Sequence, residues 1–196
     1  MPVDKARIEA AVAEILAAIG EDPTRAGIAL TPRRFAEAYE EFFAEVDCDP
    51  YDALDETFAV SDSGEEALLE QTVIVRHLAF RSVCEHHLLP FAGVAHLAYS
   101  PRERVVGLGR LSRVVAAVAS RLQLQERMTE QVVDVLDRGL SPRGALVVLD
   151  AEHGCVRMRG PRETSSSTIT IAARGCLAEP AARAEIIALL GAARRE

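Results

Sequence analysis

The sequence predicts an α+β fold: an antiparallel sheet with a helix pair on one face, preceded by an N-terminal helical segment. After residue 70 the apolar pattern changes in the order strand, strand, helix, helix, strand, strand. That order is typical of a sheet whose helices are segregated to one side. Before residue 48 the apolar residues recur only with the period of a helix. At 196 residues, 49% of them hydrophobic, the chain can bury a sizeable core.

Two helices are expected in the N-terminal segment. Asp4 is a suitable N-cap for the first, and Gly20 supplies its left-handed stop. Thr31 is expected to cap the second, because a proline follows it at the first helical position. A stretch rich in Asp, Pro, Ser and Gly comes next. We therefore divide the chain into a helical segment with its connector, residues 1–64, and a main domain with a C-terminal helix, residues 65–196.

The main domain alternates between β-branched runs and helical patterns. The expected strands cover residues 71–84, 93–99, 145–150 and 166–172, and the expected helices cover 111–122, 125–139 and 180–190. The strands at the margins of such a sheet have unpaired edges, which favour pairing with another copy of the chain.

Charge and composition exclude several classes of partner. The chain has 22 Lys and Arg against 30 Asp and Glu, a net charge of −8, so no overall positive field attracts nucleic acid or an anionic membrane. The N-terminus has no signal-peptide pattern, and no apolar run approaches membrane-spanning length. We expect a cytoplasmic protein, in which thiols stay reduced. Cys48 and Cys176 lie in no motif and are expected to be plain buried thiols.

Two clusters of metal-ligating residues dominate the sequence. Cys84-Glu85-His86-His87 places three strong ligands and a carboxylate in four consecutive positions, and His153-Gly154-Cys155 repeats the chemistry downstream. Taken singly, each would be an ordinary core group. Together, the local Cys84 and His87 pair with the distant Cys155 suits Zn²⁺, and three protein ligands leave a fourth position for water, as in catalytic zinc sites. Because Cys84 and His87 are three apart, a turn must form between them.

The second cluster is expected to continue a strand. Residues two apart on a strand face the same way, so His153, Cys155, Arg157 and Arg159 should point to one side of the sheet. His153 would then lie beside the metal, where an imidazole that titrates near neutrality is suited to proton transfer. His86 is turned differently from His87 and is free for the same task.

A set of polar residues near two helix starts could bind an anionic nucleotide. Arg110 and Arg113 follow Gly109 at a helix start, and with Arg159 they form a possible polyphosphate cradle. Two arginines alone would more often be a solvated helix face. The pair Gln125 and Glu126 begins the next helix, where an acidic residue usually serves only the helix dipole.

As a whole, these residues resemble the GTP cyclohydrolase I family over nearly the entire chain. The matching motifs are Gly20-Glu21-Asp22-Pro23, Thr31-Pro32-Arg33, Cys84-Glu85-His86-His87-Leu88-Leu89-Pro90-Phe91, Gln123-Leu124-Gln125-Glu126-Arg127, His153-Gly154-Cys155 and Met158-Arg159-Gly160. The resemblance implies the tunnelling fold, a ring-stacked homodecamer with sites completed between subunits, and zinc-dependent hydrolysis of the guanine imidazole ring of GTP. Formate and 7,8-dihydroneopterin triphosphate, the first intermediate of folate and pterin biosynthesis, are the implied products.

The resemblance also implies a role for each candidate residue. The implied zinc ligands are Cys84, His87 and Cys155; the proton-transfer residues are His86 and His153; the guanine-binding pair is Gln125 and Glu126; the triphosphate contacts are Gly109, Arg110, Arg113 and Arg159. A carboxylate that accepts hydrogen bonds from N1–H and the 2-amino group selects guanine over adenine.

Gly109 and Arg110 depart from the family, which usually has Ser-Lys there. Arg110 keeps the charge, whereas Gly109 keeps only a backbone amide. We therefore expect hydrolysis of the purine ring, and leave undecided whether the later ribose rearrangement occurs.

Three alternatives follow. The chain could be a specialised or partial cyclohydrolase of a deazapurine or secondary pathway, or a non-catalytic GTP-binding paralogue. A zinc-free reductase on the same fold is disfavoured, because it would not need Cys84, His87 and Cys155 together.

Overall fold

The computed structural model describes residues 3–59, 70–160 and 162–191. The chain forms two compact units, Met1–Asp47 and Cys48–Glu196. The sequence-based boundary at residue 64 falls outside the described residues.

The first unit is a pair of helices, α1 (Lys5–Ala18) and α2 (Thr31–Phe42). Asp4 caps α1 as predicted, since its carboxylate accepts a hydrogen bond from the backbone N–H of Arg7 at 3.1 Å. Gly20 adopts a φ of +86° after the helix, which favours glycine. The predicted cap of α2 is wrong by one residue. Leu30 is the N-cap, because the backbone N–H of Thr31 already donates to the carbonyl of Ile28 at 2.9 Å and the turn closes one residue earlier.

The second unit contains a five-stranded sheet in the order β5-β2-β3-β6-β7. The strands are β2 (Val73–Cys84), β3 (Pro90–Ser100), β5 (Leu122–Gln123), β6 (Gly144–His153) and β7 (Thr168–Gly175). The four long strands pair antiparallel, whereas the short β5 runs parallel to β2. A separate two-stranded sheet pairs β1 (Thr57–Ala59) with β4 (Arg104–Val106).

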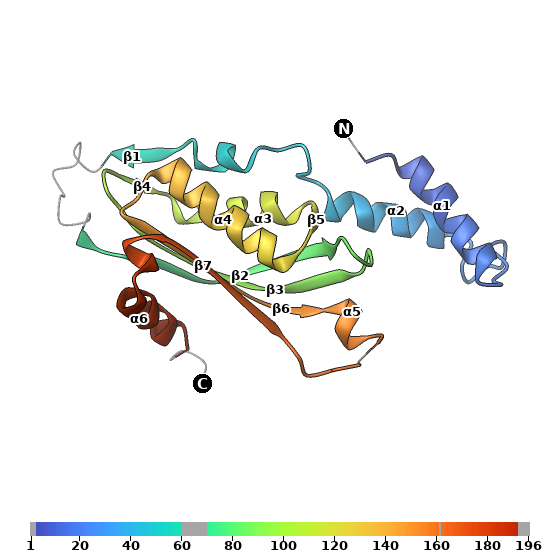
Figure 1. The fold of residues 1–196 in the computed structure, drawn as a ribbon. Helices are drawn as coiled ribbons and strands as arrows, with labels where there is room; N and C mark the ends of the chain where they lie inside the picture. Colours follow the sequence, from blue (N-terminus) through green and yellow to red (C-terminus); the bar gives the residue numbers. More distant parts are fainter. Residues whose placement is uncertain (1–2, 60–69, 161, 192–196) are drawn as a thin grey trace. The chain divides into compact units, whose positions relative to one another are not determined.

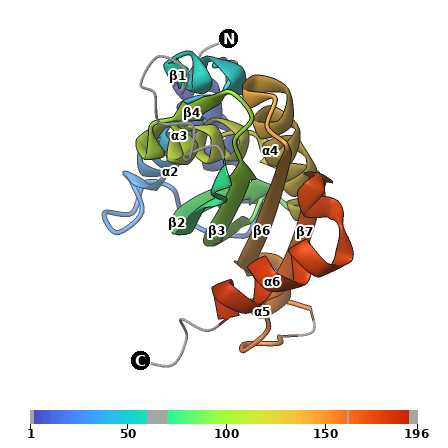
Figure 2. The same ribbon diagram turned by 90° about the vertical axis from the view of Figure 1, so that its left-hand side faces the viewer.

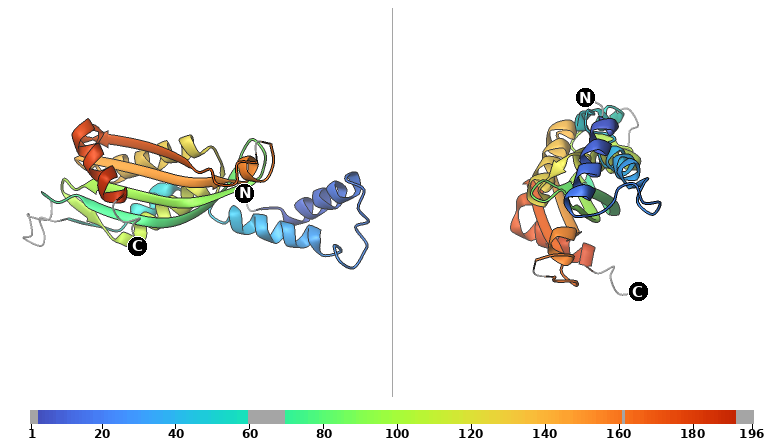
Figure 3. Two further views of the ribbon diagram at one scale, coloured as in Figure 1. Left: turned by 90° about the horizontal axis from the view of Figure 1, so that it is seen from below. Right: turned by 90° about the vertical axis from the view of Figure 1, so that its right-hand side faces the viewer.

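The helices lie on both faces of this sheet. Between β4 and β6 come α3 (Leu108–Ala119) and α4 (Gln125–Leu140), which lie together on one face (Figures 1 and 2). On the other face α6 (Pro180–Gly191) lies near the ends where β6 begins and β7 finishes (Figure 3). Short helices η1 (Pro50–Leu54), α5 (Gly154–Arg157) and η4 (Cys176–Ala178) complete the unit. The predicted α+β order, with the helix pair on one face, is confirmed.

The core follows the alternation of the strands. Leu97 and Val147 point toward α3 and α4 into the larger apolar cluster, whereas Ala98 and Leu146 point toward α6 into the smaller one. At Gly93 the strands β3 and β6 approach so closely that a Cβ would lie 2.0 Å from the carbonyl oxygen of Asp150. This packing keeps β3 and β6 in a fixed register, which aligns their ends.

Two cysteines outside the metal motifs are exposed, so the prediction that Cys48 and Cys176 are buried is wrong. Cys48 opens the second unit, and the guanidinium of Arg121 donates to its carbonyl oxygen at 2.6 Å. Cys176 follows Gly175, whose φ of +56° turns the chain away from the sheet.

The described residues contain no helix that is both long enough and apolar enough to cross a bilayer.

Candidate metal centre and active site

The antiparallel sheet brings the two metal motifs to the same end. The beginning of β3 pairs with the end of β2 through Pro90 and Val83, and with the end of β6 through Phe91 and His153. Because β2 and β6 both run opposite to β3, both finish there. Cys84 and His153 therefore lie at the same end of the sheet, on the two strands that flank β3, although 153 − 84 = 69 positions separate them in sequence.

The predicted turn after Cys84 is present. Residues 85–87 leave the sheet, the backbone N–H of Cys84 donates to the carbonyl of Leu89 at 2.9 Å, and the N–H of Leu88 donates to the carbonyl of Cys84 at 2.9 Å. Leu88 takes a φ of +53°, a left-handed conformation that costs free energy outside glycine. The turn folds His87 back toward the end of β2.

The second motif does not continue as a strand, so the predicted alignment of His153, Cys155, Arg157 and Arg159 on one side of the sheet is wrong. Strand β6 ends at His153, where its last partner on β3 is Phe91. Beyond that pair β3 offers only its first residue, Pro90, which has no backbone N–H to donate to β6, and residues Gly154–Arg157 form the short helix α5. The helix turns the Cys155 side chain back over the end of the sheet.

The three predicted metal ligands converge. Ligand atoms of Cys84, His87 and Cys155 all lie within 4.8 Å of one another. Around a tetrahedral zinc, with Zn–S near ~2.3 Å and Zn–N near ~2.0 Å, such atoms stand about 3.5 Å apart, so only a small closure is needed. Two thiols and an imidazole are donors that zinc prefers. The group therefore fits a zinc ion with one position left open.

The thiol of Cys155 holds its proton more strongly here than in water. Burial raises the pKa of the Cys155 thiol, and the neighbouring Cys84 raises it further, whereas the charge of Arg159 opposes both. Arg159 thus lies close enough to the metal group to act on it electrostatically.

His153 is held by a buried glutamine. The side-chain nitrogen of Gln125 donates to the carbonyls of Leu149 at 3.2 Å and Thr168 at 2.8 Å, and to the hydroxyl of Thr170 at 3.1 Å. Its oxygen therefore faces His153 and accepts from Nε2 at 2.7 Å. The Nε2 atom carries a proton, and Nδ1 is the nitrogen that can gain and lose one.

The surroundings of His153 restrict its ring and lower its basicity. The imidazole stacks on Phe91, with ring centroids 4.6 Å apart and planes 4° from parallel. Burial lowers the pKa of His153, and the carboxylate of Glu126 opposes that change. Glu126 is exposed at the first turn of α4, directly after the buried Gln125. The turn that follows Cys84, residues 85–88, is called the metal turn below. His86 is exposed on it, and its ring lies edge-on to that of His87, with ring centroids 6.2 Å apart.

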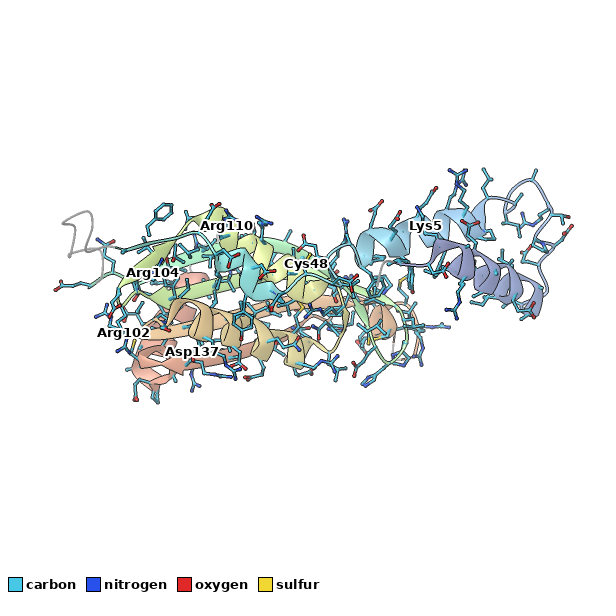
Figure 4. The ribbon with its side chains drawn as sticks, turned by 90° about the horizontal axis from the view of Figure 1, so that it is seen from above. Lys5, Cys48, Arg102, Arg104, Arg110 and Asp137 are labelled. Carbon is cyan, nitrogen blue, oxygen red and sulfur yellow. The ribbon has the colours of Figure 1, made fainter. Side chains whose placement is uncertain are left out.

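The arginines of the predicted polyphosphate cradle lie in separate parts of the chain: Arg159 acts on the metal group, whereas Arg110 and Arg113 lie on α3. The hydroxyl of Ser82 donates to the carbonyl of Ala119 at 2.7 Å, so α3 reaches the metal end of the sheet with its C-terminus. Arg110 lies in the first turn of that helix, at the opposite end, and Arg113 lies near its middle. Arg110 precedes Ala119 by 119 − 110 = 9 positions, roughly 13 Å along the axis at 1.5 Å per residue. Figure 4 shows Arg110 in the same half of the second unit as Arg104, which lies on β4.

Arg110 has an acidic partner that sequence reasoning missed. Its guanidinium pairs with Glu56, just before β1, and this contact holds the pKa of the Glu56 carboxyl below its usual range. Glu56 lies far from Arg110 in sequence, in a segment without periodicity, so no local signal identifies it.

A second missed group supports the metal turn. Glu85 of that turn pairs with Arg127 of α4, which lowers the pKa of the Glu85 carboxyl. Glu85 and Arg127 both lie inside motifs that resemble the family, and this resemblance is the one feature of the sequence that could have indicated their importance.

Comparison with known proteins identifies the family of the chain. The model of the family "GTP cyclohydrolase I" matches residues 8–191. GTP cyclohydrolase 1 from Leifsonia xyli subsp. xyli is 59% identical over 192 residues, covering 96% of each chain, and GTP cyclohydrolase 1 from Carboxydothermus hydrogenoformans is 51% identical over 191 residues, again covering 96% of each. Among solved structures, the archaeosine synthase QueF-Like in the apo form aligns with 53% of this chain and 93% of its own, at TM-score 0.44 and 14% identity. The extent and identity of the sequence matches establish that the chain belongs to the GTP cyclohydrolase I family.

Proposed function

We propose that this chain is a zinc-dependent GTP cyclohydrolase that opens the guanine imidazole ring of GTP, releases formate and forms 7,8-dihydroneopterin triphosphate. The observation that carries the proposal is the convergence of Cys84, His87 and Cys155 within 4.8 Å, beside an oriented histidine. The family assignment supplies the substrate. The product is the first intermediate of folate and pterin synthesis. We place the reaction in the cytoplasm, where reduced thiols are available to the metal.

Cys84, His87 and Cys155 would hold the zinc. When bound, that ion supplies Lewis-acid activation of a water molecule at its open position. The chain's own contribution is geometric: the turn after β2 and helix α5 present two thiolates and one imidazole from separate segments to one point.

His153 is the proposed proton donor to N7 of the guanine ring. Its Nε2–H is committed to Gln125, so Nδ1 is the atom that delivers and recovers the proton. Burial lowers the pKa of His153, and the carboxylate of Glu126 opposes that change, which favours the charged ring that a proton donor requires. His86, exposed on the metal turn, is the second proton-transfer residue by resemblance.

Glu126 is the proposed selector of guanine. Its exposed carboxylate at the start of α4 can accept from N1–H and the 2-amino group, a donor pair that adenine lacks. Gln125 belongs to the same pair by resemblance. Its side-chain amide would have to leave four partners inside the chain to reach a base.

Gly109, Arg110 and Arg113, together with Arg159, are the proposed triphosphate contacts. Because α3 separates Arg110 from the metal group, we propose that a second copy of the chain supplies Arg110 and Arg113 to each site, within a homodecamer. The sheet supports assembly: β7 is an edge strand, and Ile169 and Ile171 on it are 59% and 44% exposed.

One assay tests the proposal. The zinc-loaded protein is incubated with GTP, and formate release and pterin absorbance are followed in parallel. We expect both products in equal amounts. Bound GTP with neither product would overturn the proposal and indicate a non-catalytic paralogue.

A second candidate function is a partial cyclohydrolase that hydrolyses the purine ring without completing the pterin. It is favoured by one observation, the absence of a side chain at Gly109 beside Arg110. In the same assay, formate without pterin absorbance would support it.

A further inference from the structure

A network of hydrogen bonds and one ion pair joins the metal turn to the start of α4, and the proposed reaction does not use it. Strand β5 pairs with β2 over only two residues, Val83 with Leu122 and Cys84 with Gln123. The backbone N–H of Glu85 then donates to the carbonyl of Gln123 at 3.1 Å. A two-residue ladder is a weak attachment by itself, so side chains must contribute to holding the turn.

Arg127 closes this attachment from the helix side. Its Nη2 donates both to the Glu85 carboxylate and to the carbonyl of Leu122, the latter at 3.0 Å. Its Nε donates to the side-chain oxygen of Gln123 at 3.2 Å. One planar guanidinium thus joins the metal turn, β5 and α4, which a single ammonium group could not do with the same geometry.

The network extends into the core through Gln123, which is 1% exposed. The side-chain nitrogen of Gln123 donates to the carbonyl of Val118 at 2.9 Å and to the side-chain oxygen of Gln131 at 2.7 Å. Because Gln123 is hydrogen-bonded to both α3 and α4, its side-chain oxygen holds the Arg127 guanidinium in a fixed position. An exposed ion pair alone contributes little, but a pair held in a bonded network can maintain geometry.

We propose that Arg127 is a positioning residue of the metal centre, which acts through Glu85 to keep His87 in reach of the two thiols. Cys155 reaches the site from α5, a different segment, so the distance between His87 and Cys155 depends on where the turn is held. If the contact between Arg127 and Glu85 is lost, the metal turn can move as a unit, because hydrogen bonds within the turn still join Cys84 to Leu88 and Leu89. This inference rests on the proposed metal site.

The test measures metal affinity rather than turnover. Zinc affinity of the full-length Arg127→Met variant is determined by competition with a chelator, and the Co²⁺-substituted protein is examined by visible absorption. We expect zinc binding to weaken about 10- to 100-fold, the range seen when groups that orient metal ligands are removed. The Co²⁺ bands should change in position and intensity because the donor geometry changes.

Arg174→Met is the matched control. Arg174 also pairs with α4, through Glu130 at 2.6 Å and Asp134 at 2.8 Å, and its side chain is 33% exposed against 42% for Arg127. The control variant loses a comparable ion-pair network away from the metal turn. Its zinc affinity should stay within about twofold of the parent protein's, because an exposed ion pair contributes little. Equal affinities and identical Co²⁺ spectra for the two variants would overturn the inference.

Glu85→Gln keeps the proposal testable if Arg127→Met folds poorly. It removes the charge but preserves the shape of the side chain, and it should weaken zinc binding in the same direction. In the double variant the two losses should not add, because both remove one contact. Full additivity would show that Arg127 does not act through Glu85. Since zinc affinity is read without GTP, failure of this inference is separate from failure of the proposed activity.

Discussion

The side-chain oxygen of Gln125 lies 2.7 Å from Nε2 of His153, and the Gln125 nitrogen has three acceptors of its own. This contact fixes both the tautomer and the direction of the ring that is proposed to transfer a proton. It also changes what is expected of Gln125, since its buried amide nitrogen already serves three acceptors and has no free donor for a base without rearrangement.

Replacement of Gln125 by Leu should therefore lower kcat for GTP more than it raises KM. We expect kcat to fall by about 10- to 100-fold, part of the 10²–10⁴ that general acid–base catalysis supplies, with KM within about threefold. Steady-state kinetics on the zinc-loaded protein measures both constants.

The comparison variant is Glu126→Gln, which keeps the size of the side chain and removes the carboxylate. It should raise KM for GTP and reduce discrimination against ATP. If Gln125→Leu instead raises KM and leaves kcat unchanged, its side chain binds the base directly.

Cys155→Ala and His153→Ala should separate metal binding from proton transfer. Cys155→Ala removes one of three ligands, so bound zinc and activity should be lost together. His153→Ala should retain zinc and lose about 10²–10⁴ of turnover. Metal content per chain and formate release are measured on the same samples. Cys176→Ala, which removes an exposed thiol, is the control and should preserve both. Full activity of His153→Ala would remove the proton-donor assignment.

Most of the fold follows from periodicity in the sequence. The β-branched runs up to Cys84 and from residue 145 became β2 and β6, and the 3.6-residue stripes became α3 and α4, because packing on both faces of the sheet demands these patterns. Helix α5 did not follow from pattern. Its sequence continues the alternation of β6, but a strand needs a neighbour that can bond to it. Beyond Phe91, β3 offers only Pro90, which has no backbone N–H.

The candidate site was predictable only in part. Cys84, His87 and Cys155 were identified because metal ligands are chemically distinctive and clustered. The contacts of Arg127 with Glu85, and of Glu56 with Arg110, join ordinary charged residues that are 42 and 54 positions apart, by 127 − 85 and 110 − 56. A sequence with many such charges gives no indication of which ones meet, since their proximity is decided by the fold.

Gly109→Ser tests whether the missing hydroxyl limits pterin formation. A Cβ at Gly109 meets nothing within 4 Å, so serine should fit without strain. Serine is also the better helix former, and the free energy of unfolding should stay unchanged or rise by up to ~0.5 kcal/mol. We expect formate release to remain within about twofold of the parent protein's rate. Pterin formation should increase if the ribose rearrangement is the slow step in the parent protein. Thermal unfolding and product ratios give the two readouts. Gly109→Ala controls for backbone effects.

Glu56→Gln should strengthen GTP binding. In the chain Glu56 neutralises Arg110, and a triphosphate that uses Arg110 must displace it. Removing the carboxylate should lower KM by about two- to fivefold, as expected for an exposed ion pair, and the gain should shrink at high salt. Glu37→Gln, which breaks the exposed pair with Arg33, should leave KM unchanged. An unaltered KM for Glu56→Gln would argue against a phosphate contact by Arg110.

Helix α3 reaches the metal end of the sheet with its C-terminus and carries Arg110 in its first turn, and this separation has a genetic consequence. Under the proposed assembly, a chain lacking Arg113 and a chain lacking Cys155 are each inactive alone, yet a mixed ring contains junctions in which one supplies the intact thiolate and the other the intact guanidinium. Co-expression of the two inactive alleles should therefore restore part of the activity, whereas two alleles that both damage the metal turn should not complement each other.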